Sequence, residues 1–146
     1  MSSDRIEKQV VLKASRSRVW RAVTDYKEFG TWFKAKMENP FVVGQRSHGQ
    51  VTHPGYEHLR MDVLVERMDP EHTFTIRWHP GTENPKPGDP TTLVEFKLEE
   101  VPEGTRLTVI ESGFDKLPPE RRAEVFRGNE FGWIEQMKNI EAYIDG

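Results

Sequence analysis

The sequence predicts an α+β fold in which a curved antiparallel sheet of about six or seven strands wraps around one long C-terminal helix. Two observations carry this prediction. Short segments with alternating apolar residues recur between residues 6 and 111, and from residue 126 the apolar positions follow a helical spacing. Consecutive strands joined by short turns pair antiparallel, and the apolar face of their sheet needs a covering layer. The C-terminal helix is the predicted element long enough to cover it.

One strand and two short helices are predicted before the main run of strands. Residues 6–12 alternate loosely and favour a strand. Ser15 is a good N-cap for a helix over residues 16–23, whose apolar residues lie three to four positions apart. Asp25 is a good N-cap for a second short helix, which we expect to end at Gly30. This helix pair should close one end of the core.

Alternation predicts further strands over residues 59–66, 74–79, 94–98 and 107–111. Residues 44–53 are polar and weakly patterned, and we expect a strand there as well. Asp69-Pro70 supplies one of the turns between them. Between residues 79 and 90 the chain is rich in proline and glycine, which predicts an exposed, mobile loop.

A helix over residues 118–144 is predicted from one apolar stripe, formed by Phe126, Trp133, Met137, Ile140 and Ile144. Pro118 and Pro119 mark its start, because proline is tolerated in the first turn. Gly128 and Gly132 lie inside it, and each costs about 1 kcal/mol relative to alanine. Such glycines indicate a close approach of helix to sheet, or room for something between them. At Gly132 we expect close contact, so that a larger side chain would overpack the site.

Composition and charge narrow the function classes for these 146 residues, which we expect to form one domain over residues 1–146. No stretch approaches the ~18 apolar residues that span a bilayer, and the start of the chain lacks the apolar region of a signal peptide. We therefore expect a cytoplasmic protein without membrane insertion. The chain has no cysteine, and its net charge of −3 gives no basic footprint for nucleic acid. His53 and His58 lack a carboxylate cluster that would complete a metal site, so no metal or cofactor is expected.

Five stretches of the sequence, taken in order, carry a family resemblance. They are residues 19–25 (VWRAVTD), Trp32-Phe33, residues 65–70 leading to Trp78, residues 104–114, and residues 129–133 (NEFGW). Together they resemble the activator-of-heat-shock-protein-90-ATPase homologues of the START-like (SRPBCC, birch-pollen-allergen-like) superfamily, over nearly the whole chain. The resemblance implies a helix-grip fold with a cavity between the sheet and the long helix. The superfamily uses this cavity for lipids, polyketides and other hydrophobic molecules.

The candidate site residues are those whose position in a strand or helix directs them into this cavity: Trp78, Phe96, Glu111, Phe126, Trp133 and Met137. The five apolar members either pack as core or line a ligand pocket. Glu111 shares the inward face of its strand with Leu107 and Val109, where a charged carboxylate is costly unless it is paired or hydrated. It is either a polar anchor or proton acceptor inside the cavity, or a solvated residue at the strand end.

The leading interpretation is a small non-enzymatic protein that binds a hydrophobic or amphipathic small molecule between the sheet and the C-terminal helix. It rests on the apolar sheet face, the glycines in the helix, and the lack of an assembled catalytic set. Two alternatives stay open. One is a protein that acts through its surface on a heat-shock chaperone, although the eukaryotic activators use an additional N-terminal domain that we do not expect here. The other is an enzyme, such as a polyketide cyclase or hydrolase, with Glu111 as base.

Overall fold

The computed structural model describes residues 5–80, 86 and 88–146. In chain order its elements are β1 (Arg5–Leu12), α1 (Arg16–Thr24), α2 (Tyr26–Phe33), β2 (Ala35–Met37), β3 (Arg46–Val51), β4 (Arg60–Asp69), β5 (Thr73–Trp78), β6 (Thr92–Val101), β7 (Gly104–Ser112), the 3-10 turn η1 (Phe114–Lys116) and α3 (Pro119–Asp145). The loop predicted between residues 79 and 90 falls partly on residues 81–85 and 87, which lie outside the described residues.

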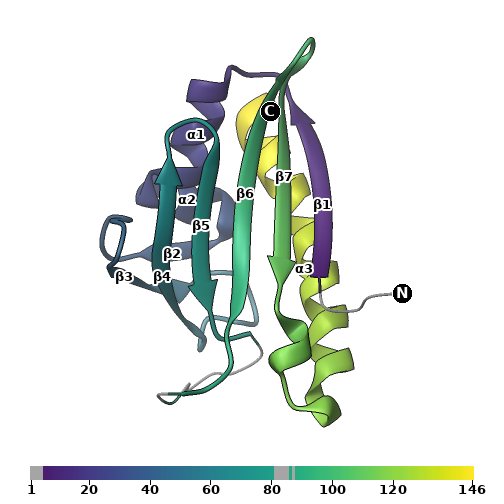
Figure 1. Ribbon diagram of the computed structural model, residues 1–146. Coiled ribbons are helices and arrows are strands. Elements are labelled where there is room, and N and C mark those ends of the chain that lie inside the picture. The colour runs from purple at the N-terminus through teal and green to yellow at the C-terminus, as the bar shows by residue number, and fades with distance from the viewer. Residues whose placement is uncertain (1–4, 81–85, 87) are drawn as a thin grey trace.

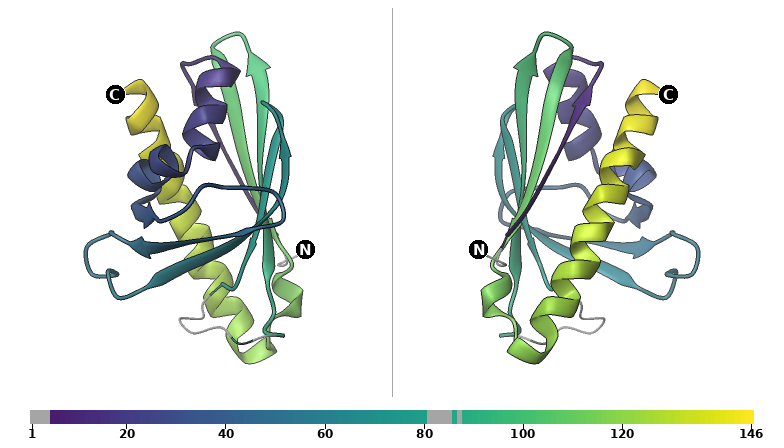
Figure 2. Two further views of the ribbon diagram at one scale, coloured as in Figure 1. Left: turned by 90° about the vertical axis from the view of Figure 1, so that its left-hand side faces the viewer. Right: turned by 90° about the vertical axis from the view of Figure 1, so that its right-hand side faces the viewer.

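The strands form one antiparallel sheet in the order β1-β7-β6-β5-β4-β3-β2. From β2 to β7 each strand pairs with the next one along the chain, and β1 joins the free side of β7. The long helix α3 runs diagonally across the inner face of this sheet, and the β2–β3 end swings away from the remaining strands (Figures 1 and 2). The predicted α+β architecture with a long C-terminal helix is confirmed. Six of the strands were predicted, whereas β2 has three residues and is too short to show an alternating pattern.

The second short helix differs from its predicted length. The side chain of Asp25 caps it as expected, accepting hydrogen bonds from the backbone N–H groups of Lys27 and Glu28. The prediction that it ends at Gly30 is wrong, because α2 continues to Phe33 and ends at Lys34, which adopts a left-handed conformation at φ 66°. Glycine is required at position 30 for a different reason. A Cβ there would collide with the carbonyl oxygen of Ala35 in the following strand.

The core lies between the inner face of the sheet and the three helices. The inward residues of β6 and β7 are buried, as their alternation predicts, and Leu107 and Val109 are fully inaccessible. From α3 the buried residues are Trp133, Met137 and Ile140. None of the described helices combines the length and the apolarity needed to cross a membrane.

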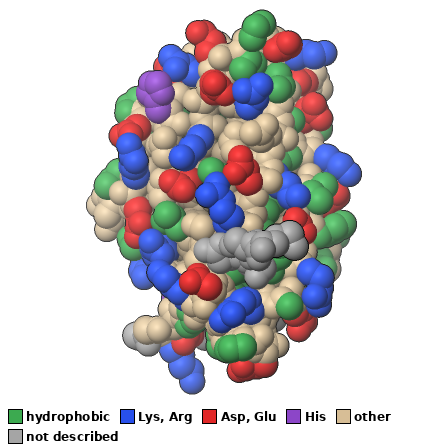
Figure 3. Space-filling model, turned by 45° about the vertical axis from the view of Figure 1, so that its right-hand side comes forward, with side chains coloured by type: hydrophobic (Ala, Val, Ile, Leu, Met, Phe, Trp, Pro, Cys, Tyr) green, Lys and Arg blue, Asp and Glu red, His purple; other side chains and the backbone are tan. Residues whose placement is uncertain are grey.

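The outer face of the sheet carries both signs of charge. Cross-strand ion pairs such as Arg77–Glu66 (2.9 Å) and Arg106–Glu99 (2.7 Å) lie on it. Acidic and basic side chains are interspersed over the surface seen in Figure 3. Within the described residues, this face therefore lacks the single-sign field with which proteins attract nucleic acid.

Glu28 of α2 joins all three helices. Its carboxylate accepts hydrogen bonds from Arg18 and Arg21 of α1 and from the hydroxyl of Tyr143 of α3, each at 2.8 Å. Burial raises the pKa of Glu28, but the hydrogen bonds from Tyr143 and Arg18 outweigh it and hold that pKa below its ordinary value. Burial and the hydrogen bond to Glu28 raise the pKa of Tyr143. The cluster fastens the last turns of α3 to the short helices.

Tyr143→Phe should lower the free energy of unfolding by about 1–2 kcal/mol near neutral pH, because the hydrogen bond to a charged carboxylate is lost while the ring stays beside Arg18. Because the pKa of Glu28 is lowered in the folded protein, the stability that its carboxylate contributes is present above the ordinary pKa range of glutamate. This stability is lost as the pH falls through the folded-state pKa. Because the pKa of Tyr143 is raised in the folded protein, the stability that its hydroxyl contributes is present below about pH 10. This stability is lost as the pH rises through the folded-state pKa. Urea unfolding across this pH range measures the difference.

Tyr26→Phe is the matched control, since the Tyr26 hydroxyl makes no hydrogen bond within the described residues. A loss of stability at Tyr26 equal to that at Tyr143 would show that the Glu28 cluster contributes nothing specific.

Candidate functional site

Glu111 lies on the inner face of β7 and is completely buried, with an exposed fraction of 0%. Its Oε1 accepts a hydrogen bond from the indole Nε1 of Trp133 at 2.8 Å. Its Oε2 accepts one from the indole Nε1 of Trp78 at 2.8 Å and one from the hydroxyl of Thr92 at 2.5 Å. The side-chain amide of Asn129 donates to both oxygens, at 3.0 and 3.1 Å. The carboxylate is therefore surrounded by donors from β5, β6 and α3.

All the groups that donate to Glu111 are uncharged. Within the described residues Glu111 forms no ion pair, and Lys8 of the neighbouring strand β1 pairs with Glu130 of α3 instead, at 3.3 Å. Burying a carboxylate is costly unless hydrogen bonds replace its lost hydration. Indole nitrogens can only donate, so the two tryptophans fix an acceptor role on both oxygens. Neutral hydrogen-bond donors therefore surround the carboxyl group, and no basic side chain among the described residues pairs with it.

Trp78 and Trp133 stack on each other as a result. Their ring centroids are 5.8 Å apart and their planes are inclined by 21°. Phe33 of α2 contacts both, with centroid distances of 6.2 Å to Trp78 and 6.1 Å to Trp133. Since each indole has its N–H bound to the same carboxylate, the rings are fixed in rotation as well as in position.

A cavity of about 130 Å³ opens beside these rings, between α3, β5 and α2. Trp78, Trp133 and Phe33 form its aromatic walls, and Gly128 and Gly132 of α3 form one side. A Cβ on either glycine would meet no atom within 4 Å. The expectation of close contact at Gly132 is therefore wrong, and the glycines leave room instead.

Two polar side chains also line this cavity, Asn129 and Gln136. Both polar atoms of the Gln136 side-chain amide form hydrogen bonds: the nitrogen donates to the carbonyl oxygen of Phe33 at 2.9 Å, and the oxygen accepts from Asn139 at 3.1 Å. The nitrogen of Asn129 is committed to Glu111. None of the described residues donates a hydrogen bond to its amide oxygen.

The six candidate residues separate into three groups. Trp78 and Trp133 line the cavity, and Glu111 lies directly behind them. Phe96 packs edge-on against Trp133 at 5.8 Å, and Met137 is 5% exposed, so both are core residues beside the cavity. Phe126 packs against Phe114 of η1 at 5.1 Å. These three apolar residues are not among those that line the cavity.

Four contributors to the site were not predicted: Phe33, Thr92, Asn129 and Gln136. Asn129 carries a recognisable signal, because it lies four residues before Trp133 on the same helix and so faces the same way. Thr92 is the first residue of its strand and offers no such signal. Among the described residues, no group of His, Asp and Glu is arranged to hold a metal. His53 and His58 therefore do not belong to such a group either.

Glu111→Gln should lower the free energy of unfolding by about 1–3 kcal/mol, because an amide keeps the shape but turns one acceptor into a donor that faces an indole N–H. Relief of the buried charge offsets part of this cost. Urea unfolding measures it, and hydrogen exchange of the two indole N–H groups should become faster in the variant.

Glu95→Gln on the outer face of β6 is the control, since it makes the same chemical change away from the indoles. Unchanged indole exchange in Glu111→Gln would contradict the role assigned to the carboxylate.

Comparisons with known proteins agree with this architecture. Over 97% of this chain and 96% of its own, the crystal structure of a Mesorhizobium loti protein superposes with a TM-score of 0.77 and 23% identity. The solution structure of an Arthrobacter aurescens protein covers 98% of this chain and 87% of its own, with a TM-score of 0.79 and 20% identity. The solution structure of the Aha1 dimer from Colwellia psychrerythraea covers 96% and 95%, with a TM-score of 0.71 and 18% identity.

At these identities the structural neighbours show the fold alone. No curated protein matches the sequence. The family model described as "Activator of Hsp90 ATPase homolog 1-like protein" matches residues 13–145. Because the match extends over most of the chain, this protein belongs to the family of Activator of Hsp90 ATPase homolog 1-like proteins.

Proposed function

We propose that this protein binds a small, flat, largely apolar molecule in the cavity beside Trp78 and Trp133, without catalysing a reaction on it. The observation that carries the proposal is a pair of stacked indoles, fixed from behind by Glu111, beside a space that two glycines leave open. Ligand pockets favour aromatic walls with a few placed polar groups. Rings that are already fixed lose little freedom when a ligand stacks on them.

The size of the cavity limits the ligand. At about 130 Å³ it is close to the apolar cavity of about 150 Å³ that accommodates benzene, and below the ~300 Å³ at which pockets for drug-sized ligands begin. One aromatic ring fits inside it. A longer molecule would place one ring there and project the rest past the exposed Gly128.

The free amide oxygen of Asn129 adds a preference for ligands with a hydrogen-bond donor. Its orientation is set, because the nitrogen of the same amide donates to Glu111. A hydroxyl or N–H on the ligand ring would satisfy this oxygen, whereas a purely apolar ring would cover it without a partner.

In this proposal Glu111 is a positioning residue. Both of its oxygens already accept hydrogen bonds, and the cavity meets it through Trp78, Trp133 and Asn129. A role as base, as in a polyketide cyclase-like enzyme, would need one of these donors to leave before a substrate could approach the carboxylate. The binding function needs no such rearrangement, and the geometry favours it.

Family membership supports a second candidate, an action on a heat-shock chaperone. The measurement that separates it from the first is direct capture of the ninety-kilodalton chaperone by the protein, with an assay of the chaperone's ATPase. Stimulation that survives occlusion of the cavity would assign this activity to the protein surface.

Gly132→Leu should abolish binding in the cavity while keeping or raising thermal stability. The new side chain meets no atom at its Cβ and fills the space beside the indoles, and leucine improves helix propensity by under about 1 kcal/mol. Phenol and toluene are matched probes in shape, and phenol should bind the wild type more tightly because it can donate to Asn129. Saturation-transfer NMR and quenching of tryptophan fluorescence measure both.

Ala123→Leu, a substitution at an exposed position near the start of α3, is the control and should leave phenol binding unchanged. Equal phenol binding by wild type and Gly132→Leu would show that the cavity is not the site. Native mass spectrometry of molecules that copurify with each variant extends the same comparison to natural ligands.

A further inference from the structure

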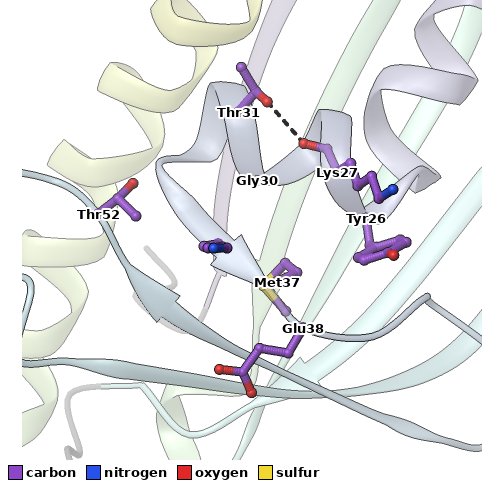
Figure 4. Close-up of a pocket in the computed structure, with 8 residues that line it drawn as sticks. Tyr26, Lys27, Gly30, Thr31, Met37, Glu38 and Thr52 are labelled. Atoms are coloured by element: carbon purple, nitrogen blue, oxygen red, sulfur yellow. Dashed lines mark hydrogen bonds between the residues drawn. The ribbon is translucent and has the colours of Figure 1, made fainter.

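A second and larger hollow lies on the other side of α2. It measures about 590 Å³ and runs between α2 and the edge strand β2, where residues of the two elements face each other (Figure 4). We call it the α2–β2 groove, formed by Tyr26, Lys27 and Gly30 of α2 and by Lys36, Met37 and Glu38 of β2 and its end. It shares no lining residue with the cavity beside Trp78 and Trp133.

The backbone N–H and C=O of Met37 in β2 make no hydrogen bond to another described residue. Thr52 donates to the carbonyl oxygen of Lys34 at 2.9 Å, and Glu38 donates to that of His48 at 2.8 Å, so the even-numbered residues from 34 to 38 form their backbone hydrogen bonds on the β3 side. The N–H and C=O of Met37 therefore point to the opposite side, and β2 is the last strand of the sheet there. Gly30 faces this edge, since a Cβ on it would lie 3.6 Å from the nitrogen of Met37.

The charge of the groove is positive. Lys27 and Lys36 form no ion pair within the described residues, and the ammonium group of Lys27 lies 5.8 Å from the centre of the Tyr26 ring. Glu38 is the acidic residue of the lining, and Arg60 neutralises it with two hydrogen bonds, at 2.7 and 3.0 Å. Lys36 also lies close enough to Glu38 to help lower the pKa of that carboxyl group. An anion would therefore meet Lys27 and Lys36 beside one carboxylate that Arg60 already pairs.

The groove also has an apolar part, formed by the Tyr26 ring and the side chain of Met37. We propose that the α2–β2 groove is a second binding site, which takes a small amphipathic anion. Its carboxylate, sulfonate or phosphate group is held by Lys27, Lys36 and the free N–H of Met37. Its apolar body lies against Tyr26 and Met37. A volume of about 590 Å³ is within the range of small-molecule sites.

The test uses anilinonaphthalene sulfonate as the anionic probe and phenylnaphthylamine as its uncharged counterpart. In a fluorescence titration, the double variant Lys27→Gln/Lys36→Gln should weaken binding of the sulfonate about fivefold to tenfold, because two attractive charges are removed. Binding of the uncharged probe should change by less than about twofold. In NMR spectra of the wild type, the sulfonate should shift the backbone amide of Met37.

Two further variants keep this proposal separate from the one for the indole cavity. Lys97→Gln, on the outer sheet face, removes one lysine charge elsewhere and should leave sulfonate binding unchanged. Gly132→Leu occludes the other cavity and should also leave it unchanged. The proposal is overturned by equal weakening in Lys97→Gln, by loss of sulfonate binding in Gly132→Leu, by equal effects on the two probes, or by the absence of sulfonate binding to the wild type.

Discussion

The buried carboxylate of Glu111 connects the sheet to the long helix, because it accepts hydrogen bonds from side chains of both. β7 supplies the acid, β5 and β6 supply Trp78 and Thr92, and α3 supplies Asn129 and Trp133. Removing the acid would leave the buried indole N–H of Trp133 and the partly buried one of Trp78 without their acceptors. The position of α3 over the sheet is thus fixed by directional bonds as well as by apolar packing.

This constraint also accounts for the size of the cavity. Aromatic rings pack against one another in the space between the sheet and α3. Trp133 alone contacts Trp78, Phe33 and Phe96. The remaining space lies where Gly128 and Gly132 interrupt the side-chain packing. Under the proposed binding function, fixed walls and a small volume would favour selectivity for flat ligands over capacity for large ones.

Strand alternation and helical spacing were sufficient to predict the architecture and the inward direction of Trp78, Glu111 and Trp133. They could not predict that these three side chains bond to each other, since Trp78 and Glu111 are 33 positions apart in sequence and meet only through strand register. Nor could they predict that Phe126 would turn toward Phe114, because η1 carries no periodic signal. Periodicity identifies a face of an element, whereas a site depends on which residues of several faces come into contact.

The glycines show the same limit in its simplest form. A glycine inside a helix costs about 1 kcal/mol wherever it occurs, so the sequence marks the position without giving the reason. Gly30 is required because Ala35 approaches too closely for any side chain, and this contact brings β2 against α2. Gly128 and Gly132 have the opposite role, since a Cβ there would meet empty space. A hollow at the protein surface lies beside each of these glycine positions. Close contact at Gly30 brings the edge of β2 to the α2–β2 groove. The missing side chains on α3 leave open the cavity beside the indoles.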